Sequence, residues 1–241
     1  MSTSSERYLL AVLDNKTPTM RHNTLLFDLD GTLIDQFSAI HKSVNHVQNT
    51  LGIETSSFER VKAAVGGSIR LTLKRLFEDA DLESTLPLFV EHFESIMMDE
   101  VFILPGVEAF LDKAKVRNLQ MAVFTNKIGK HARATVEHLN LDHYFDLVLG
   151  AEDTPYRKPN PKFTHHLTAA LNTDLKDCCL IGDSPFDWQT GQAVDMPVYL
   201  LATGTHSADA LRAETGSNQI YSNFTTFAEA YFSDNLCHHE A

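Results

Sequence analysis

Two aspartates separated by one residue, Asp28 and Asp30, follow directly on an apolar run at 24–27. Because side chains alternate between the two faces of a strand, both carboxylates should project to the same side where an expected strand at 24–27 ends. Two carboxylates held close together repel each other unless a cation or a proton lies between them. Such oxygen ligands suit Mg²⁺. The pair indicates a metal site, and the alternative is an ordinary acidic turn, since Asp-Gly is a common turn signal.

Groups that can bind a phosphoryl oxygen occur later in the chain. Thr125 and Asn126 come directly after an apolar run at 119–124, and a hydroxyl with backbone amides at a helix start can donate to phosphate oxygens. An ordinary helix cap gives the same pattern. Lys158 lies in a loop that two prolines stiffen, so its ammonium should be held in place to offset the charge of a phosphoryl group or nucleophile. The alternative is a solvated loop lysine.

A third apolar run, at 178–181, ends in Gly182 and Asp183. Asp183 supplies a further carboxylate for a cation. Asp187, four residues on, falls in the first turn of the next expected helix. There it can cap the helix, or it can hold Lys158 or a metal-bound water.

The elements that must position these groups alternate between strand and helix in the second part of the chain. Strands are expected at 119–124, 145–149, 178–181, 198–201 and 219–221, with helices at 106–117, 129–139, 161–171, 186–194 and 224–232. This pattern predicts an α/β fold with a Rossmann-like parallel sheet and helices on both faces. Ligands of such sheets bind beyond the carboxyl ends of the strands. The polar groups after Phe27, Phe124 and Ile181 should therefore meet.

Residues 36–102 show helical patterns throughout. Four helices are expected at about 40–51, 57–65, 68–79 and 84–99, so this insertion predicts a separate four-helix cap at 36–102. The catalytic core is then expected at 24–35 and 103–241. Residues 1–23 form an N-terminal extension, in which residues 7–13 are expected to form a short helix.

Composition excludes several classes of partner. The chain has 241 residues, of which 43% are hydrophobic, so it can bury a sizeable core. Its 20 Lys and Arg against 32 Asp and Glu give a formal net charge of −12, which should repel nucleic acid and anionic membranes. No apolar run approaches the ~18 residues of a membrane span. The cysteines form neither a disulfide framework nor a paired metal motif. We expect a cytoplasmic monomer or homodimer without nucleic-acid or membrane partners.

Four motifs, taken in order, resemble those of the haloacid dehalogenase-like hydrolase superfamily. They are Asp28-Leu29-Asp30-Gly31-Thr32-Leu33, Thr125-Asn126, Lys158-Pro159 and Gly182-Asp183-Ser184-Pro185-Phe186-Asp187. The resemblance spans residues 24–202, and the helical insertion resembles the first-position cap of this family. The Thr-Asn-Lys at 125–127 and the Gly-Asp-Ser at 182–184 are most similar to phosphoglycolate phosphatase-like enzymes. Asp195 departs from the pattern, because that position usually has glycine, and it should adopt a left-handed conformation.

The resemblance implies a Mg²⁺-dependent phosphatase that acts through an aspartyl-phosphate on a small phosphorylated metabolite, phosphoglycolate-like or sugar-phosphate-like. Asp28 would be the nucleophile, and its phosphorylation would divide one difficult displacement into two easier ones. Asp30 would protonate the leaving alkoxide and then take a proton from the hydrolytic water. Mg²⁺ would be bound by Asp28, the backbone carbonyl of Asp30, Asp183 and waters.

The resemblance also assigns the groups around the phosphoryl. Thr125 and the Asn126 amide would hold its oxygens, while Lys158, oriented by Asp187, would offset charge on the nucleophile and the transferred group. The cap would select the substrate. Arg70, just beyond a Gly-Gly turn, is a candidate to grip a substrate carboxylate or second phosphate, and the alternative is a solvated helix residue.

Two further functions remain open. A sugar-phosphate mutase would use the same Asp28 and Asp30 but return the phosphoryl group to the substrate, and the Thr-Asn-Lys at 125–127 in place of a Ser/Ala-rich segment leans against it. An interaction protein that retains the fold without activity is the non-enzymatic alternative, and the presence of every motif residue argues against it.

Overall fold

The structure is a computed structural model that describes residues 22–77 and 81–234. The short helix expected within residues 7–13 lies outside the described residues, as does most of the N-terminal extension. Among the helices that the structure describes, none combines the length and the apolar composition needed to cross a membrane.

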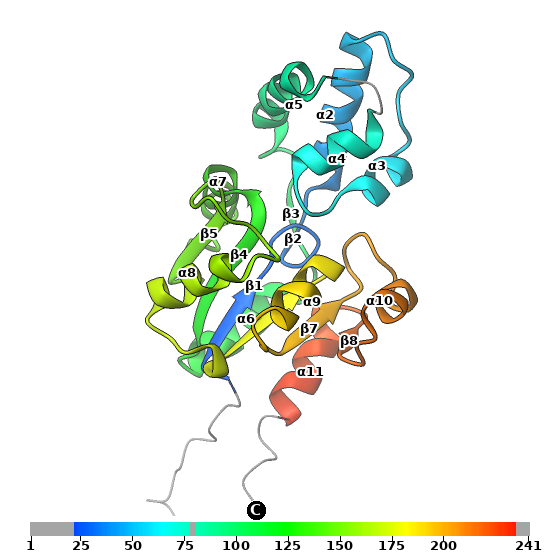
Figure 1. Ribbon diagram of the computed structural model, residues 1–241. Helices are drawn as coiled ribbons and strands as arrows, with labels where there is room; N and C mark the ends of the chain where they lie inside the picture. The colour runs from blue at the N-terminus through cyan, green and yellow to red at the C-terminus, as the bar shows by residue number, and fades with distance from the viewer. Residues whose placement is uncertain (1–21, 78–80, 235–241) are drawn as a thin grey trace, which may run out of the picture.

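Six parallel strands form the central sheet in the order β5–β4–β1–β6–β7–β8 (Figure 1). Their bounds are β1 (Thr24–Phe27), β4 (Gln120–Ile128), β5 (Leu147–Ala151), β6 (Cys178–Gly182), β7 (Val198–Leu201) and β8 (Ile220–Tyr221). In the centre, Phe27 of β1 is aligned with Val123 of β4 on one side and Ile181 of β6 on the other. The predicted α/β class with a parallel sheet is confirmed, and the three strand ends that carry the polar motifs are direct neighbours.

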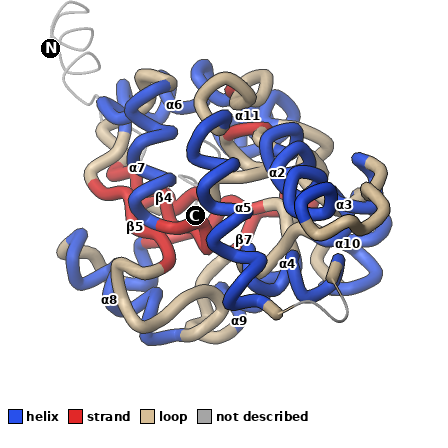
Figure 2. Tube along the Cα trace, turned by 90° about the horizontal axis from the view of Figure 1, so that it is seen from above, coloured by secondary structure: helices blue, strands red, loops and turns tan. Residues whose placement is uncertain are grey.

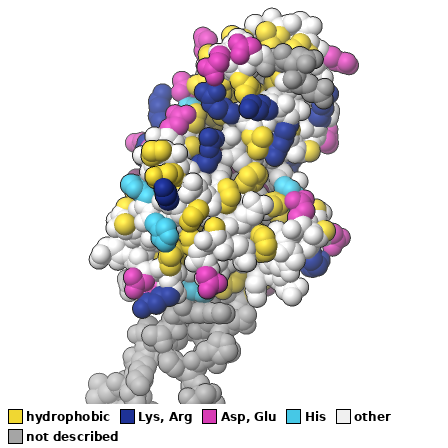
Figure 3. Space-filling model, in the orientation of Figure 1, with side chains coloured by type: hydrophobic (Ala, Val, Ile, Leu, Met, Phe, Trp, Pro, Cys, Tyr) yellow, Lys and Arg dark blue, Asp and Glu magenta, His cyan; other side chains and the backbone are white. Residues whose placement is uncertain are grey.

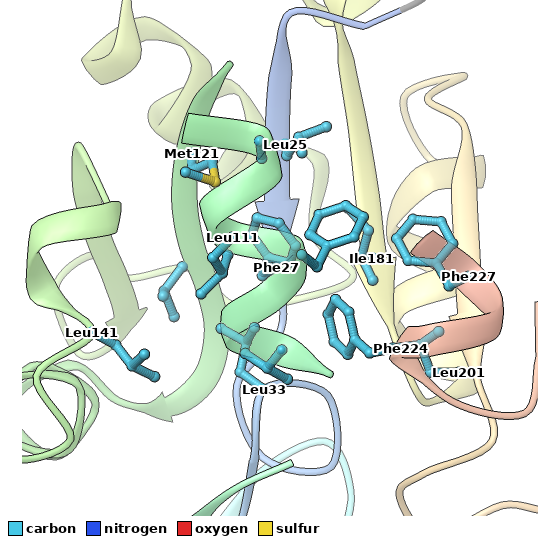
Figure 4. Close-up of a cluster of buried hydrophobic side chains, with 14 of the residues drawn as sticks. Leu25, Phe27, Leu33, Leu111, Met121, Leu141, Ile181, Leu201, Phe224 and Phe227 are labelled. Carbon is cyan, nitrogen blue, oxygen red and sulfur yellow. The ribbon is translucent and has the colours of Figure 1, made fainter. Parts of the chain in front are cut away.

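Helices cover both faces of this sheet (Figure 2). One face packs against α6 (Val107–Val116), α7 (Gly129–His138) and α11 (Phe224–Asp234), and the other against α8 (Pro161–Leu171), α9 (Pro185–Gln192) and α10 (Ala208–Thr215). Leu25 and Phe27 point into the first layer, while Leu26 points into the second. Figure 4 shows Phe27 surrounded by Leu111, Ile181 and Phe224 in the first of these cores. This alternation fixes β1 rigidly beneath the aspartates that follow it.

Two details of the core differ from the expectation. Helix α10 was not predicted, because only Leu211 and Thr215 are buried in it and a periodic apolar pattern is therefore weak. Strand β4 does not end before Thr125 but continues to Ile128, because Ile128 still pairs with Ala151 of β5 after a register shift. Two short 3₁₀ helices, η1 (Asp142–Tyr144) and η2 (Leu175–Asp177), lead into β5 and β6.

Four helices form the cap: α2 (Phe37–Thr50), α3 (Phe58–Ala64), α4 (Ile69–Leu76) and α5 (Leu82–Ile96). They enclose a hydrophobic cluster of their own, which includes Val44, Leu73 and Phe93. An antiparallel pair of two-residue strands, β2 (Ile34–Asp35) and β3 (Phe102–Ile103), joins them to the core. The predicted boundaries at 35 and 103 fall at this pair, and the division into two domains stays a prediction.

The cap lies above the carboxyl ends of the strands (Figure 1). Two of its contacts with the core come from α5 and from the loop before α4. On one side, Glu94 of α5 pairs with Lys130 and His131 of α7, at 3.1 and 2.7 Å. On the other, the loop before α4 packs on Phe186: a Cβ added at Gly67 would lie 2.7 Å from the Cζ atom of that ring. Only glycine allows this close approach.

Candidate active site

The segment after β1 turns sharply so that its aspartates stay at the strand end. The Asp28 N–H donates to Ile181 O at 2.9 Å, which extends the sheet ladder by one residue. The N–H groups of residues 32–34 then all donate to Leu29 O, at 2.9–3.2 Å. Gly31 permits the turn with a φ of +86°, a value that disfavours any residue with a Cβ.

Asp183, at the end of β6, is 3% exposed and packed tightly into this turn. Thr32 Oγ1 donates to its Oδ1 at 2.9 Å. A Cβ added at Gly31 or Gly204 would lie 2.6 or 1.7 Å from its Oδ2. The two glycines therefore leave room for this oxygen, and the threonine orients the carboxylate.

Lys158 lies between two carboxylates. Its Nζ is 2.6 Å from Asp187 Oδ1 and 3.0 Å from Asp28 Oδ1, and its side chain is 2% exposed. Burial alone lowers the pKa of this ammonium, but the carboxylates of Asp187 and Asp28 outweigh burial and raise the pKa above its usual value. Lys158 is therefore cationic at neutral pH, and its burial excludes the alternative of a solvated loop lysine.

Asp187 uses both of its oxygens within the protein. Oδ1 accepts from Lys158, while Oδ2 accepts from Ser184 Oγ at 2.6 Å, Ser184 N at 3.1 Å and Asp183 N at 3.3 Å. The bonds to Ser184 form a capping box at the start of α9. This geometry matches an orienting group better than a direct metal ligand.

Asn126 holds the backbone of Lys158. Its Nδ2 donates to Lys158 O at 3.0 Å, and its Oδ1 accepts from Lys158 N at 2.8 Å. The expectation that Thr125 and Asn126 begin a helix is wrong, because both lie within β4. The side-chain amide of Asn126 is therefore committed to the lysine loop. The Thr125 hydroxyl accepts from Lys127 N at 3.1 Å and keeps its own proton for donation.

The carboxylates of this site repel one another in a poorly solvated place. Burial raises the pKa of Asp28 to about 6, although nearby Lys158 acts in the opposite direction. Burial, with Asp28 and Asp187 adding to it, raises the pKa of Asp183 well above its usual range. One lysine does not compensate three neighbouring carboxylates, of which Asp183 and Asp187 are buried, so their full ionisation requires a further cation.

The residues present fit a divalent metal ion. Oxygens of Asp28, Asp183 and Asp187 lie within 4.8 Å of one another. Because Asp187 bonds within the protein through both of its oxygens, Asp28 and Asp183 are the candidate ligands of this group. Among the described residues, no donor has hydrogen-bond geometry to the buried Oδ1 of Asp28, although Lys158 lies close to it in an ion pair. A hard cation with oxygen ligands satisfies both the charge and this oxygen.

Lys127 belongs to the site, and the sequence reasoning gave it no role. Its Nζ lies 3.0 Å from both oxygens of Asp30 and 2.6 Å from Gln36 Oε1, and its side chain is 7% exposed. A signal was present: Lys127 follows Thr125 by two residues, so both side chains point to the same side of an extended strand.

A cavity of about 130 Å³ lies between the cap and the core. Six of the predicted site residues line it: Asp28, Asp30, Thr125, Asn126, Lys158 and Asp183. The wall from the cap is largely apolar and includes Phe37, Ile40, Ile69, Phe89, Val90 and Phe93. The cavity therefore combines a charged floor with an apolar roof, as expected for a small anionic ligand whose charge lies at one end.

The structure does not bring Arg70 to this cavity. Its Nη1 pairs with Glu83 Oε1 at 3.2 Å, and the two side chains are 48% and 80% exposed. Lys and Arg side chains gather on the visible face of the cap (Figure 3), where they can attract an anion without contacting it in the cavity.

Known proteins resemble this chain in sequence and in fold. The model of a family described as haloacid dehalogenase-like hydrolase matches residues 25–201. The phosphoglycolate phosphatase of Rhodobacter capsulatus is 33% identical over 187 residues, 75% of this chain and 84% of that protein. That of Aquifex aeolicus is 27% identical over 201 residues, 83% of this chain and 90% of that protein. The structure of a predicted phosphatase from Clostridium acetobutylicum superimposes with a TM-score of 0.80 at 24% identity, covering 88% of this chain and 99% of that chain.

The chain belongs to the haloacid dehalogenase-like hydrolase family. It is an enzyme of the phosphoric monoester hydrolase class, a phosphatase. The predicted family and its phosphoglycolate phosphatase-like relatives are confirmed, as is the predicted class of enzyme.

Proposed function

We propose that this phosphatase is Mg²⁺-dependent and hydrolyses a small phosphorylated metabolite through a phosphorylated Asp28. The observation that supports this best is the position of Asp28 at the end of the central strand. Its carboxylate faces the cavity, with Lys158 on one side and Asp183 nearby.

In the first half-reaction, an oxygen of Asp28 attacks phosphorus while the bond from phosphorus to the leaving oxygen breaks. Asp30, in its acid form, gives its proton to that leaving oxygen. In the second, water attacks the phosphorus of the aspartyl-phosphate, Asp30 takes a proton from the water, and Asp28 is released as a carboxylate. Inorganic phosphate and the alcohol are the products.

The remaining residues bind the phosphoryl group and neutralise the negative charge around it. Asp28, the backbone carbonyl of Asp30 and Asp183 would hold Mg²⁺, which would supply positive charge against the phosphoryl oxygens. The Thr125 hydroxyl and the Asn126 backbone N–H donate to those oxygens. Lys158 offsets the charge on Asp28, and Asp187 keeps the ammonium in place.

The substrate candidates to test first are phosphoglycolate-like and sugar-phosphate-like compounds. Two relatives are named phosphoglycolate phosphatases. The cavity of about 130 Å³ suits a small leaving group. The largely apolar cap wall offers few hydrogen-bond partners. Among such compounds it should therefore favour those whose leaving groups are least polar.

The experiment is a phosphate-release assay on a panel of phosphorylated metabolites, with and without Mg²⁺. The wild-type chain should release phosphate only with Mg²⁺, and Asp28→Asn should be inactive while its circular dichroism spectrum is unchanged. Near wild-type turnover by folded Asp28→Asn would contradict the assignment of the nucleophile. Isomerisation of a hexose 1-phosphate without free phosphate would establish the mutase instead.

A further inference from the structure

Lys127 occupies a position between the proposed acid–base residue and the hinge of the cap. It lies near the end of β4, beside β1 in the sheet, and its side chain crosses to Asp30 in the segment after β1. Its ammonium has three N–H donors. Two oxygens of Asp30 at 3.0 Å and Gln36 Oε1 at 2.6 Å give these donors a full set of acceptors.

The contact to Gln36 connects this lysine to both chain segments that lead into the cap. Gln36 is 1% exposed and directly precedes α2. Its Nε2 donates to the carbonyl of Met97, which follows α5. The ring of Phe93, also on α5, lies 5.1 Å from the Lys127 ammonium, a cation–π distance.

The burial of the Lys127 ammonium has an energetic cost. Desolvating a charge costs more than an apolar residue at the same place, unless the charge is fully paired. Here the pairing is directed at one carboxylate, Asp30, whose side chain is 19% exposed and lines the cavity. A cation in contact with both oxygens fixes the orientation of that carboxylate.

We propose that Lys127 is a positioning residue that holds the Asp30 carboxylate for proton removal from the hydrolytic water and ties it to the hinge through Gln36. This inference rests on the proposed function, because it concerns the second half-reaction. There the aspartyl-phosphate on Asp28 is attacked by water, and the proton released by that water moves to Asp30. Lys127 contacts both oxygens of Asp30 and so fixes the direction of the carboxylate that would accept this proton.

The two half-reactions can be separated with p-nitrophenyl phosphate and Mg²⁺ in stopped-flow measurements. Its leaving group needs little protonation, so phosphorylation of Asp28 should survive the loss of Lys127. Lys127→Met should give a burst of about one p-nitrophenolate per enzyme molecule, followed by a steady rate at least about tenfold below wild type, since general-base catalysis contributes about 10²–10⁴-fold. The burst also reports the folded, active fraction.

Three further variants sharpen this test. Lys130→Met is the matched control, because Lys130 lies three residues on and also pairs across to the cap, with Glu94, but does not contact Asp30. It should keep the wild-type rate. Gln36→Leu should lower the steady rate and keep the burst. The double variant with Asp30→Asn and Lys127→Met should have the same steady rate as Asp30→Asn alone, because the lysine acts through that carboxylate.

The outcomes distinguish the role of Lys127 from the proposed function. If wild type releases no p-nitrophenolate with Mg²⁺, the proposed function fails. If wild type is active, two results for Lys127→Met overturn only the role of Lys127: an unchanged steady rate, or the loss of both the burst and the steady phase. A double variant that is slower than Asp30→Asn alone overturns it as well. An unchanged Gln36→Leu overturns the link to the hinge.

Discussion

The ammonium of Lys158 lies 2.6 Å from Asp187 Oδ1, and the two side chains are 2% and 0% exposed. The same ammonium is 3.0 Å from Asp28 Oδ1. One buried cation therefore compensates two carboxylates from different elements, Asp28 after β1 and Asp187 in the first turn of α9. Removal of the cation leaves both carboxylates without their positive counter-charge, so stability and catalysis should depend on the same ammonium.

Lys158→Met should lower the free energy of unfolding by about 3–5 kcal/mol, the usual result of removing one partner of a buried ion pair. It should also abolish phosphate release, because the charge on Asp28 is no longer offset. Urea unfolding and a phosphate assay measure the two effects. Lys176→Met, which removes an exposed pair with Asp174, is the control and should change neither. Full activity in Lys158→Met would contradict the role of this lysine.

Thr32→Val tests the orientation of Asp183. The hydroxyl of Thr32 is buried and donates to Asp183 at 2.9 Å, so its loss leaves the carboxylate less well directed. The Mg²⁺ concentration for half-maximal activity should rise by about 10–100-fold, as for other hydrogen-bond partners of metal ligands. Thr190→Val removes a comparable hydroxyl that only bonds to Phe186 O within α9, and it should leave the Mg²⁺ requirement unchanged. Equal Mg²⁺ requirements in the two variants would contradict the role of Thr32 in orienting Asp183 for metal binding.

Stabilisation by Mg²⁺ should depend on pH. Burial raises the pKa of Asp28 from 3.8 to about 6. Between these values the folded metal-free protein keeps a proton that the unfolded chain has released, so its free energy of unfolding falls as pH rises. Metal binding requires the ionised carboxylate and is favoured above pH 6. In thermal unfolding at pH 7.5, Mg²⁺ at 100 times its Kd should add about 2.7 kcal/mol. The same Mg²⁺ concentration at pH 5 should add much less, and an equal gain at both pH values would argue against this site.

The strand ends were predictable because a parallel sheet brings them together whatever the side chains are. Asp28, Thr125 and Asp183 each follow an apolar run, and β1 lies between β4 and β6. The left-handed conformation expected at Asp195 is also present, with a φ of +55°. These features follow from local pattern and one topological rule.

Contacts between side chains of separate elements were not predictable in the same way. The bonds from Asn126 to the Lys158 backbone depend on the extension of β4 past Phe124. The sequence does not indicate this extension, because a Thr-Asn pair is typical of a turn. The pairing of Arg70 with Glu83 depends on how α4 packs beside α5. Such partners are set by tertiary distances, and a single sequence contains no direct measure of them.

Gly67→Ala tests how the cap contacts the core. A Cβ at Gly67 would lie 2.7 Å from Phe186 Cζ, and its φ is +80°. Gly52→Ala is a matched control, because Gly52 has a φ of +67° but no atom within 4 Å of such a Cβ. Both variants should lose about 1–2 kcal/mol to the left-handed backbone. Only Gly67→Ala should also lower kcat/KM, by up to about 10²-fold, since a shift of about 1 Å in a cavity wall misplaces the substrate. Equal kcat/KM values in the two variants, measured with their unfolding curves, would show that this contact has no part in catalysis.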